Sequence, residues 1–105
     1  MIFGLSQFYR KNPSVVRLYA KRLAPKNVRV NCVIPGVVIT KAWKNITPPN
    51  METKDLVEKV TKSLPMKRPA DAREIGAAIA FLCSDKAQYI TGVALPVDGG
   101  AHLGF

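Results

Sequence analysis

The chain has 105 residues, of which 48% are hydrophobic and 22% charged, and its formal net charge at pH 7 is +9. This length is enough for one small domain, and the composition is that of a folded globular protein and not of a disordered segment. No apolar run approaches the roughly 18 residues of a membrane-spanning helix, so the sequence predicts no such helix.

The positive charge is concentrated in the first part of the chain. Residues 1–44 contain nine lysines and arginines and no acidic residue, whereas residues 45–105 contain seven basic and seven acidic residues. Such a basic segment can attract nucleic acid, anionic lipid or an acidic partner. We expect a solvated surface instead of a nucleic-acid site, because no aromatic residues suited to base stacking are interleaved with the cations.

The first helix is predicted over residues 13–24. Asn12-Pro13 is a helix-start signal, and apolar residues then recur at helical spacing: Val15, Val16, Tyr19, Ala20 and Leu23. Residues 1–26 are also rich in arginine and free of acids, which is typical of mitochondrial presequences. Because no signal peptide, lipidation motif or peroxisomal targeting end is seen in the sequence, we expect a cytoplasmic protein, with the mitochondrion as the alternative.

A buried strand is predicted over residues 28–34, because this short segment is rich in β-branched residues and Pro35-Gly36 follows it. Residues 37–51 are predicted to form an irregular loop that contains two adjacent prolines. A second helix is predicted from Glu52 to Leu64, with Leu56, Val60 and Leu64 on its apolar face.

The third helix is predicted over residues 72–83, where Asp71 and Glu74 form the pattern of a capping box. Its apolar face consists of Ile75, Ala78, Ile79 and Leu82, with Phe81 beside it. The last strand is predicted over 93–97, and it should lie at a sheet edge because Pro96 cannot donate a ladder hydrogen bond. A strand–helix–strand crossover of this length predicts an α/β fold with two parallel strands.

The remaining residues with chemical potential are few. Cys32 and Cys83 lie in apolar segments, and we expect two buried thiols. His102 has no partner nearby in the sequence that would orient it, so we expect no chemical role for it. No spacing typical of metal ligands occurs, and we predict no metal site.

Several segments, in order, carry a family resemblance. They are residues 23–31, the turn Pro35–Thr40, the helix 71–85 and the strand end Val97–Gly100. Together they resemble the C-terminal part of the short-chain dehydrogenase/reductases, over about residues 23–101. The resemblance implies one partial domain over residues 1–105, which is the C-terminal piece of a Rossmann-like, doubly wound parallel sheet. Residues 1–12 would be a leader outside the family pattern.

The resemblance also implies site residues for the cofactor NAD(P), at the carboxyl end of a strand where dinucleotides dock. Those near its nicotinamide end are Pro35, Gly36, Val38 and Thr40. The loop after them resembles the variable substrate lid, with Trp43, Ile46 and Met51 as its aromatic and apolar members.

The chain departs from the family pattern in its catalytic and cofactor-binding parts. No glycine-rich nucleotide-binding turn occurs, and the strand that carries the family's catalytic serine has no counterpart. An ungapped count places the family's Tyr-x-x-x-Lys pair at Leu5 and Tyr9, whereas a one-turn gap places it at Tyr9 and Pro13. Because neither pair can protonate a carbonyl as the family does, we assign no catalytic residue. The isolated chain is expected to be inactive and to bind no cofactor tightly.

Three functions stay open. The first is a fragment or truncated form of an NAD(P)-dependent oxidoreductase that acts on a carbonyl or alcohol. The second is a non-enzymatic module that binds full-length relatives through helix 13–24, helix 72–83 and edge strand 93–97. The third is a binder of nucleic acid or of a membrane surface through residues 10–44. We also expect the strand 28–34 to expose Val28, Val30, Val33 and Ile34, which would make the isolated chain loosely packed, oligomeric or aggregation-prone.

Overall fold

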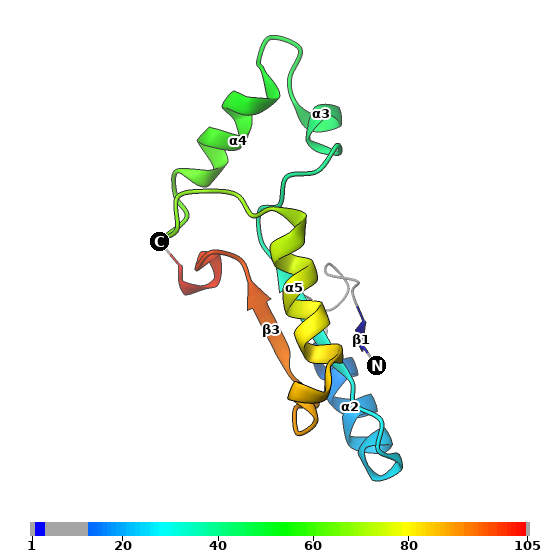
Figure 1. The fold of residues 1–105 in the computed structure, drawn as a ribbon. Helices are drawn as coiled ribbons and strands as arrows, with labels where there is room; N and C mark the ends of the chain where they lie inside the picture. The colour runs from blue at the N-terminus through cyan, green and yellow to red at the C-terminus, as the bar shows by residue number, and fades with distance from the viewer. Residues whose placement is uncertain (1, 4–12, 105) are drawn as a thin grey trace.

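The computed structural model describes Ile2–Phe3 and residues 13–104 (Figure 1). Leu5 and Tyr9, two of the three positions to which the family's Tyr-x-x-x-Lys pair was aligned, lie outside these described residues, as does most of the predicted leader 1–12. The helices are α2 (Pro13–Leu23), α3 (Trp43–Ile46), α4 (Thr53–Thr61) and α5 (Ala72–Cys83), and the strands are β1 (Ile2–Phe3), β2 (Asn31–Pro35) and β3 (Ala94–Val97). Short 3-10 turns follow at Ala24–Lys26, Asp85–Ala87 and Ala101–Leu103.

The strands form one parallel sheet in the order β1-β2-β3. The predicted α/β class and parallel pair are confirmed, with β2 and β3 in register from Cys32 opposite Ala94 to Pro35 opposite Val97. The short strand β1 was not predicted, and it lies on the inner edge of β2. Within the described sheet β3 is an edge strand, as Pro96 predicted.

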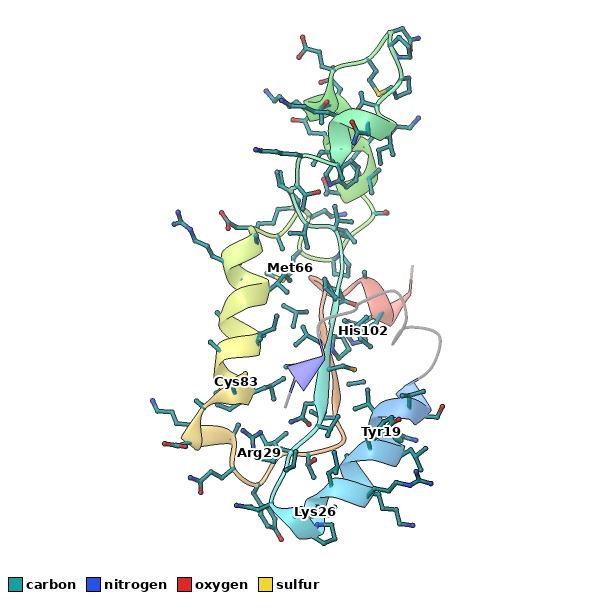
Figure 2. The ribbon with its side chains drawn as sticks, turned by 90° about the vertical axis from the view of Figure 1, so that its right-hand side faces the viewer. Tyr19, Lys26, Arg29, Met66, Cys83 and His102 are labelled. Carbon is teal, nitrogen blue, oxygen red and sulfur yellow. The ribbon has the colours of Figure 1, made fainter. Side chains whose placement is uncertain are left out.

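Two helices cover opposite faces of this sheet, as Figure 2 shows with α2 on one side of β2 and α5 on the other. On one face Val16 and Ala20 of α2 pack against Val30 and Cys32. The prediction that this strand exposes its valines is therefore wrong for Val30 and Val33, which are buried. Both layers come from this chain, so β2 has apolar cover on each face.

Helix α5 has the predicted capping box and the predicted inward face. Ile75 and Ile79 are half-buried, and Leu82 is 1% exposed, whereas Phe81 is 45% exposed. Cys83 is exposed, so the prediction of two buried thiols holds only for Cys32. The reason is helical geometry, because Cys83 lies one residue, or about 100°, beyond the buried Leu82.

Helix α4 ends at Thr61, before the predicted Leu64, and its predicted apolar face is confirmed for Leu64 and in part for Leu56 but not for Val60. Val57, Thr61 and Leu64 are buried, whereas Val60 is 37% exposed. The prediction missed Thr61, whose hydroxyl donates to the carbonyl of Val57 at 2.8 Å. Because this bond satisfies the hydroxyl within its own helix, a threonine can occupy the buried face.

The molecule is elongated, with extents of 55 × 27 × 24 Å. Helices α3 and α4 form a lobe that projects beyond the sheet (Figure 1). The radius of gyration is 15.9 Å, where a compact domain of this length would have about 13 Å. The accessible surface is 7665 Å², where a compact monomer of this mass would expose about 5,800 Å². The chain thus exposes more surface than a compact domain of its size would.

Within the described part of the chain, no helix is long and apolar enough to cross a membrane. Residues 2–3 and 13–104 also contain no group of three or more histidine, cysteine or carboxylate side chains arranged to hold a metal ion.

Candidate functional site

The site implied by the resemblance lies where β2 and β3 end side by side. The backbone N–H of Gly36 donates to the carbonyl of Val97 at 3.2 Å, directly after the two strands. A Cβ atom at Gly36 would lie 2.7 Å from the Cβ of Asp98. Only glycine lets the two strand ends approach this closely without displacement of the backbone, which explains the Pro-Gly turn in physical terms.

Beyond this turn the backbone is fixed to the segment before α5. The N–H of Ile39 donates to the carbonyl of Ala70 at 3.1 Å, and the N–H of Ala70 donates to the carbonyl of Val37 at 2.8 Å. This is a parallel bridge between Val38 and Ala70, in which the N–H and C=O of Val38 itself point away from Ala70.

The two backbone groups of Val38 differ in their hydrogen bonding. Its carbonyl accepts a hydrogen bond from the indole Nε1–H of Trp43 at 2.8 Å. Its N–H has no hydrogen-bond partner among residues 2–3 and 13–104. A residue whose N–H and C=O point to the same side, as Val38 does in this bridge, is the arrangement that pairs with another amide, as a neighbouring strand does.

An open hollow of about 610 Å³ adjoins this turn. One wall is the turn itself, another is the inward side of α5, and Trp43 closes a third side. Its lining residues are Pro35, Gly36, Val37, Val38, Thr40, Trp43, Ala72, Ile75, Gly76 and Ile79. The hollow therefore brings together all four residues implied for the cofactor and one of the three implied for the lid.

The other two lid residues do not line this hollow. Ile46 is 66% exposed on α3, and Met51 is half-buried in the connection between α3 and α4. The segment predicted as an irregular loop over 37–51 contains the short helix α3. The lobe thus presents its tryptophan to the hollow and its isoleucine to solvent.

Asp98 and His102 form a second polar feature beside the turn. The Nδ1 of His102 lies 3.0 Å from the Oδ1 of Asp98, and the carboxylate also accepts from the backbone N–H groups of Gly100 and His102. Burial alone would raise the pKa of the Asp98 carboxyl, but hydrogen bonds from His102 and the two N–H groups outweigh it, and the net shift is downward. Our expectation that His102 lacks an orienting partner is wrong, because the Gly99-Gly100 turn brings the chain back onto Asp98.

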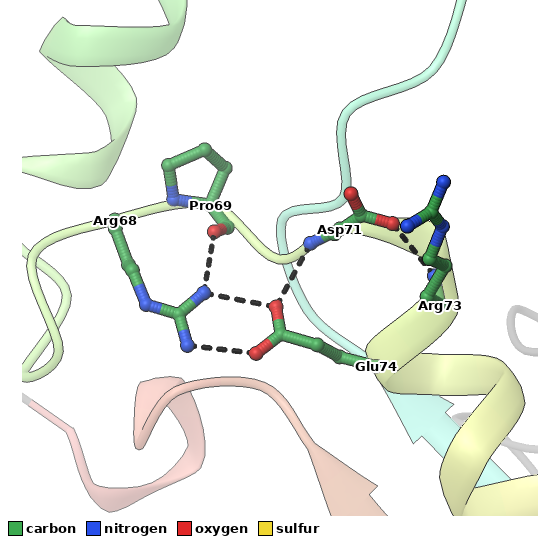
Figure 3. Close-up of polar contacts among 5 residues, drawn as sticks. All are labelled: Arg68, Pro69, Asp71, Arg73 and Glu74. Atoms are coloured by element: carbon green, nitrogen blue, oxygen red, sulfur yellow. Dashed lines mark hydrogen bonds and ion pairs between the residues drawn. The ribbon is translucent and has the colours of Figure 1, made fainter.

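A third polar group fixes the start of α5, as Figure 3 shows. The carboxylate of Glu74 makes two hydrogen bonds with the guanidinium of Arg68, at 2.8 and 2.9 Å, and accepts from the N–H of Asp71 at 2.9 Å. The hydrogen bond from Arg68 is the main reason that the pKa of Glu74 falls to about 2. Asp71 in turn accepts from the N–H of Arg73 at 2.8 Å, so these side chains occupy amide groups that could otherwise bind a phosphate.

The residues present therefore fit one end of a nicotinamide dinucleotide. Val38 offers an amide donor and acceptor on one side, and the mostly apolar hollow has room for a ring. A pyrophosphate needs glycine amides at an open helix N-terminus. In the part of the chain that the structure describes, the α5 N-terminus is closed by its own capping box.

Comparison with known proteins gives the family. A family model described as enoyl-(acyl carrier protein) reductase matches residues 13–102. The chain belongs to the short-chain dehydrogenase/reductase family. Its relatives include an uncharacterized oxidoreductase, YmfI, of Bacillus subtilis, which is 44% identical over 85% of this chain and 34% of its own length. Glucose 1-dehydrogenase of Gluconobacter oxydans is 42% identical over 86% of this chain and 32% of its own length.

Two solved structures of reductases superpose well on the chain. YwfH, described as an NADPH-dependent reductase involved in bacilysin biosynthesis, aligns over 99% of this chain and 47% of its own, with a TM-score of 0.82 and 27% identity. Levodione reductase aligns over 89% of this chain and 37% of its own, with a TM-score of 0.78 and 30% identity. The chain spans about a third of the length of the curated relatives above.

Two parts of this candidate site escaped the sequence analysis. The inward face of α5 was assigned to packing alone, although Ile75, Gly76 and Ile79 also line the hollow. Asp98 was considered only as part of a motif, and its spacing of four residues from His102 was the available signal of their contact.

Proposed function

We propose that this chain is the C-terminal part of an NAD(P)-dependent oxidoreductase that interconverts a carbonyl and an alcohol. It would supply the nicotinamide side of the active site and, in the lobe of α3 and α4, the substrate lid. The observation that supports this most is the amide pair of Val38 at the mouth of a hollow beside the ends of parallel strands.

Each part of the site has a separate role in this proposal. The N–H and C=O of Val38 would hold the carboxamide of the nicotinamide, and Gly36 keeps the turn narrow enough for both strands to end beside it. The apolar wall of α5 would exclude water from the face of the ring. The cofactor, when bound, supplies or accepts the hydride.

The isolated chain would lack the proton-transfer step. The described tyrosines are Tyr19, 48% exposed on α2, and Tyr89, which is fully exposed, and neither lines the hollow. Tyr89 lies at the other end of the sheet, next to Ile90, whose carbonyl accepts from the Asn31 side chain at the start of β2. The chain alone is therefore proposed to be catalytically inactive and to bind whole dinucleotides weakly.

The large exposed surface supports the proposal that a further protein layer covers this chain. The chain exposes 7665 Å², roughly a third more than the about 5,800 Å² expected of a compact monomer. In this proposal the difference is covered by the cofactor-binding half of the domain, on the same or on another polypeptide. A cytoplasmic location is part of the proposal.

A chimera tests this function. Residues 13–102 would replace the matching C-terminal segment of the Bacillus subtilis relative YmfI, with which they share 44% identity. The chimera is expected to bind NAD(P)H about as tightly as YmfI itself does, whereas the 105-residue chain alone is expected to bind it only weakly and to show no turnover. A folded chimera that binds no NAD(P)H, or turnover by the 105-residue chain alone, would contradict the proposal.

A second candidate function is an interaction module without enzymatic activity. It is favoured by exposed apolar side chains on the two covering helices, since Leu18 and Tyr19 of α2 are 46% and 48% exposed and Phe81 of α5 is 45% exposed. These helices and the edge strand β3 would then bind a full-length relative or a second copy. Co-purification of the chain with a longer family member supports this candidate, and a monomer that captures none speaks against it.

A further inference from the structure

Trp43 ties the lobe of α3 and α4 to the turn after β2. It is the sole tryptophan of the chain, and it begins the four-residue helix α3. Its indole donates to the carbonyl of Val38 at 2.8 Å. A hydrogen bond of 3.2 Å between the hydroxyls of Thr47 and Thr53 then joins the end of α3 to the start of α4. The contact with Val38 therefore links the lobe to the turn that borders the hollow.

The indole occupies one half of a recognition pair. The N–H of Val38 has no partner among the described residues, whereas its C=O is held by Trp43. A ligand that pairs with both groups must present an acceptor and an N–H donor side by side, as a primary carboxamide does. A carbonyl oxygen has two lone pairs, but Trp43 and Val38 line the same hollow, so the ligand's donor would approach this carbonyl from the side that the indole already occupies.

We propose that Trp43 is a displaceable cap on the Val38 carbonyl, and that a primary carboxamide replaces the indole there when it binds in the hollow. This inference rests on the proposed function, because the ligand it names is the nicotinamide end of the cofactor. Trp43 is then a positioning and specificity residue, because it holds the lid against the turn until an amide arrives.

The cap also discriminates between closely similar ligands. Indole Nε1–H is only a donor, so the site it vacates is an acceptor that needs another donor. A carboxamide supplies this donor, whereas a carboxylate of the same shape has only acceptors and would leave the Val38 carbonyl unpaired. The hollow should therefore prefer the amide to the acid and release Trp43 only for the amide.

The single tryptophan makes the test direct, because a ¹⁵N-labelled 105-residue chain has one indole N–H signal. Nicotinamide mononucleotide and nicotinic acid mononucleotide differ at the amide and lack the adenylate half. The amide is expected to shift the indole signal and to speed its exchange with solvent by more than about tenfold, because a hydrogen bond is opened. The acid is expected to leave the signal unchanged.

A substitution tests the competition itself. Trp43→Phe keeps an aromatic ring in the wall and removes the donor, so the affinity for nicotinamide mononucleotide should rise about two- to tenfold, the range for loss of one competing hydrogen bond. The acid should show no such gain. Asn45→Ala is the matched control, since Asn45 is exposed on α3 and does not line the hollow. It should change neither the indole signal nor the affinity.

Two results would contradict the proposed cap and leave the proposed function standing. They are binding of the amide with an unmoved indole signal, and weaker binding by Trp43→Phe, which would mean that the indole only supports the lobe. Failure of both the natural chain and Trp43→Phe to bind the amide at tens of millimolar would overturn the nicotinamide-side assignment of the proposed function, and the cap with it.

Discussion

Gly36→Ala should destabilise the chain through a steric conflict between two strand ends. The new Cβ would lie 2.7 Å from the Cβ of Asp98 and 2.8 Å from its Cα. Both are closer than carbon atoms can pack, and one of them belongs to the backbone, so the end of β2 or β3 must shift. Overpacking of this kind costs about 1–3 kcal/mol, which for a domain of this size lowers the melting temperature by about 4–24 °C.

Gly76→Ala is the matched control, because an added Cβ at Gly76 would meet no atom within 4 Å. In a helix interior alanine is favoured over glycine by about 0.5–1 kcal/mol, so this variant should be more stable. Urea unfolding of the two variants and the natural chain, followed by circular dichroism, measures both changes. Gly36→Ala is expected to lower the free energy of unfolding, and Gly76→Ala is expected to raise it. A Gly36→Ala chain as stable as the natural one would refute the idea that close approach of the strand ends requires glycine there.

Three further measurements check the electrostatics and burial. Because the pKa of Asp98 is lowered in the folded chain, the ionised carboxylate stabilises the fold fully at pH values well above 3.8, the ordinary pKa, and this stabilisation is lost as the pH falls below 3.8. Asp98→Asn should therefore reduce the loss of unfolding free energy on the acid side, as measured by unfolding curves. Arg68→Ala should raise the pKa of Glu74 from about 2 toward its ordinary value of 4.5 in an NMR titration, and an unchanged value would contradict the role of the guanidinium. Of the two thiols, the exposed Cys83 should react quickly with a thiol reagent, whereas Cys32, which is buried and has a raised pKa, should react only on unfolding; Cys83→Ser should abolish the fast phase.

Features that depend on neighbours along the chain could be predicted from the sequence. Pro13 and the capping box of Asp71 and Glu74 marked the starts of α2 and α5 correctly. The β-branched segment before Pro35 predicted β2, and Pro96 predicted an edge strand. These signals act through local backbone geometry and hydrogen bonds within a few residues, so they can be read without knowledge of the fold.

Most of the failures concern burial, which depends on contacts between distant segments, although the contact of His102 with Asp98 is a local one that was also missed. Val60 was assigned to a buried face that Val57 and Thr61 occupy, because helical spacing gives the period of a face but not which side meets the core. The burial of Val30 and Val33 depended on α2 and α5 together, and the short strand β1 gave no recognisable pattern.

The same division holds for the candidate site. The sequence by itself determined the order of α2, β2, α4, α5 and β3, the Pro35-Gly36 turn and the family to which these motifs point. Only the tertiary structure decided that α5 supplies a wall of the hollow, that Trp43 holds the carbonyl of Val38, and that Gly36 packs against Asp98. The physical reason is that a motif specifies which groups a segment offers, whereas their partners are chosen by packing and by hydrogen bonds, such as those that join Asn31 to Ile90 and Val93 across about sixty residues of chain.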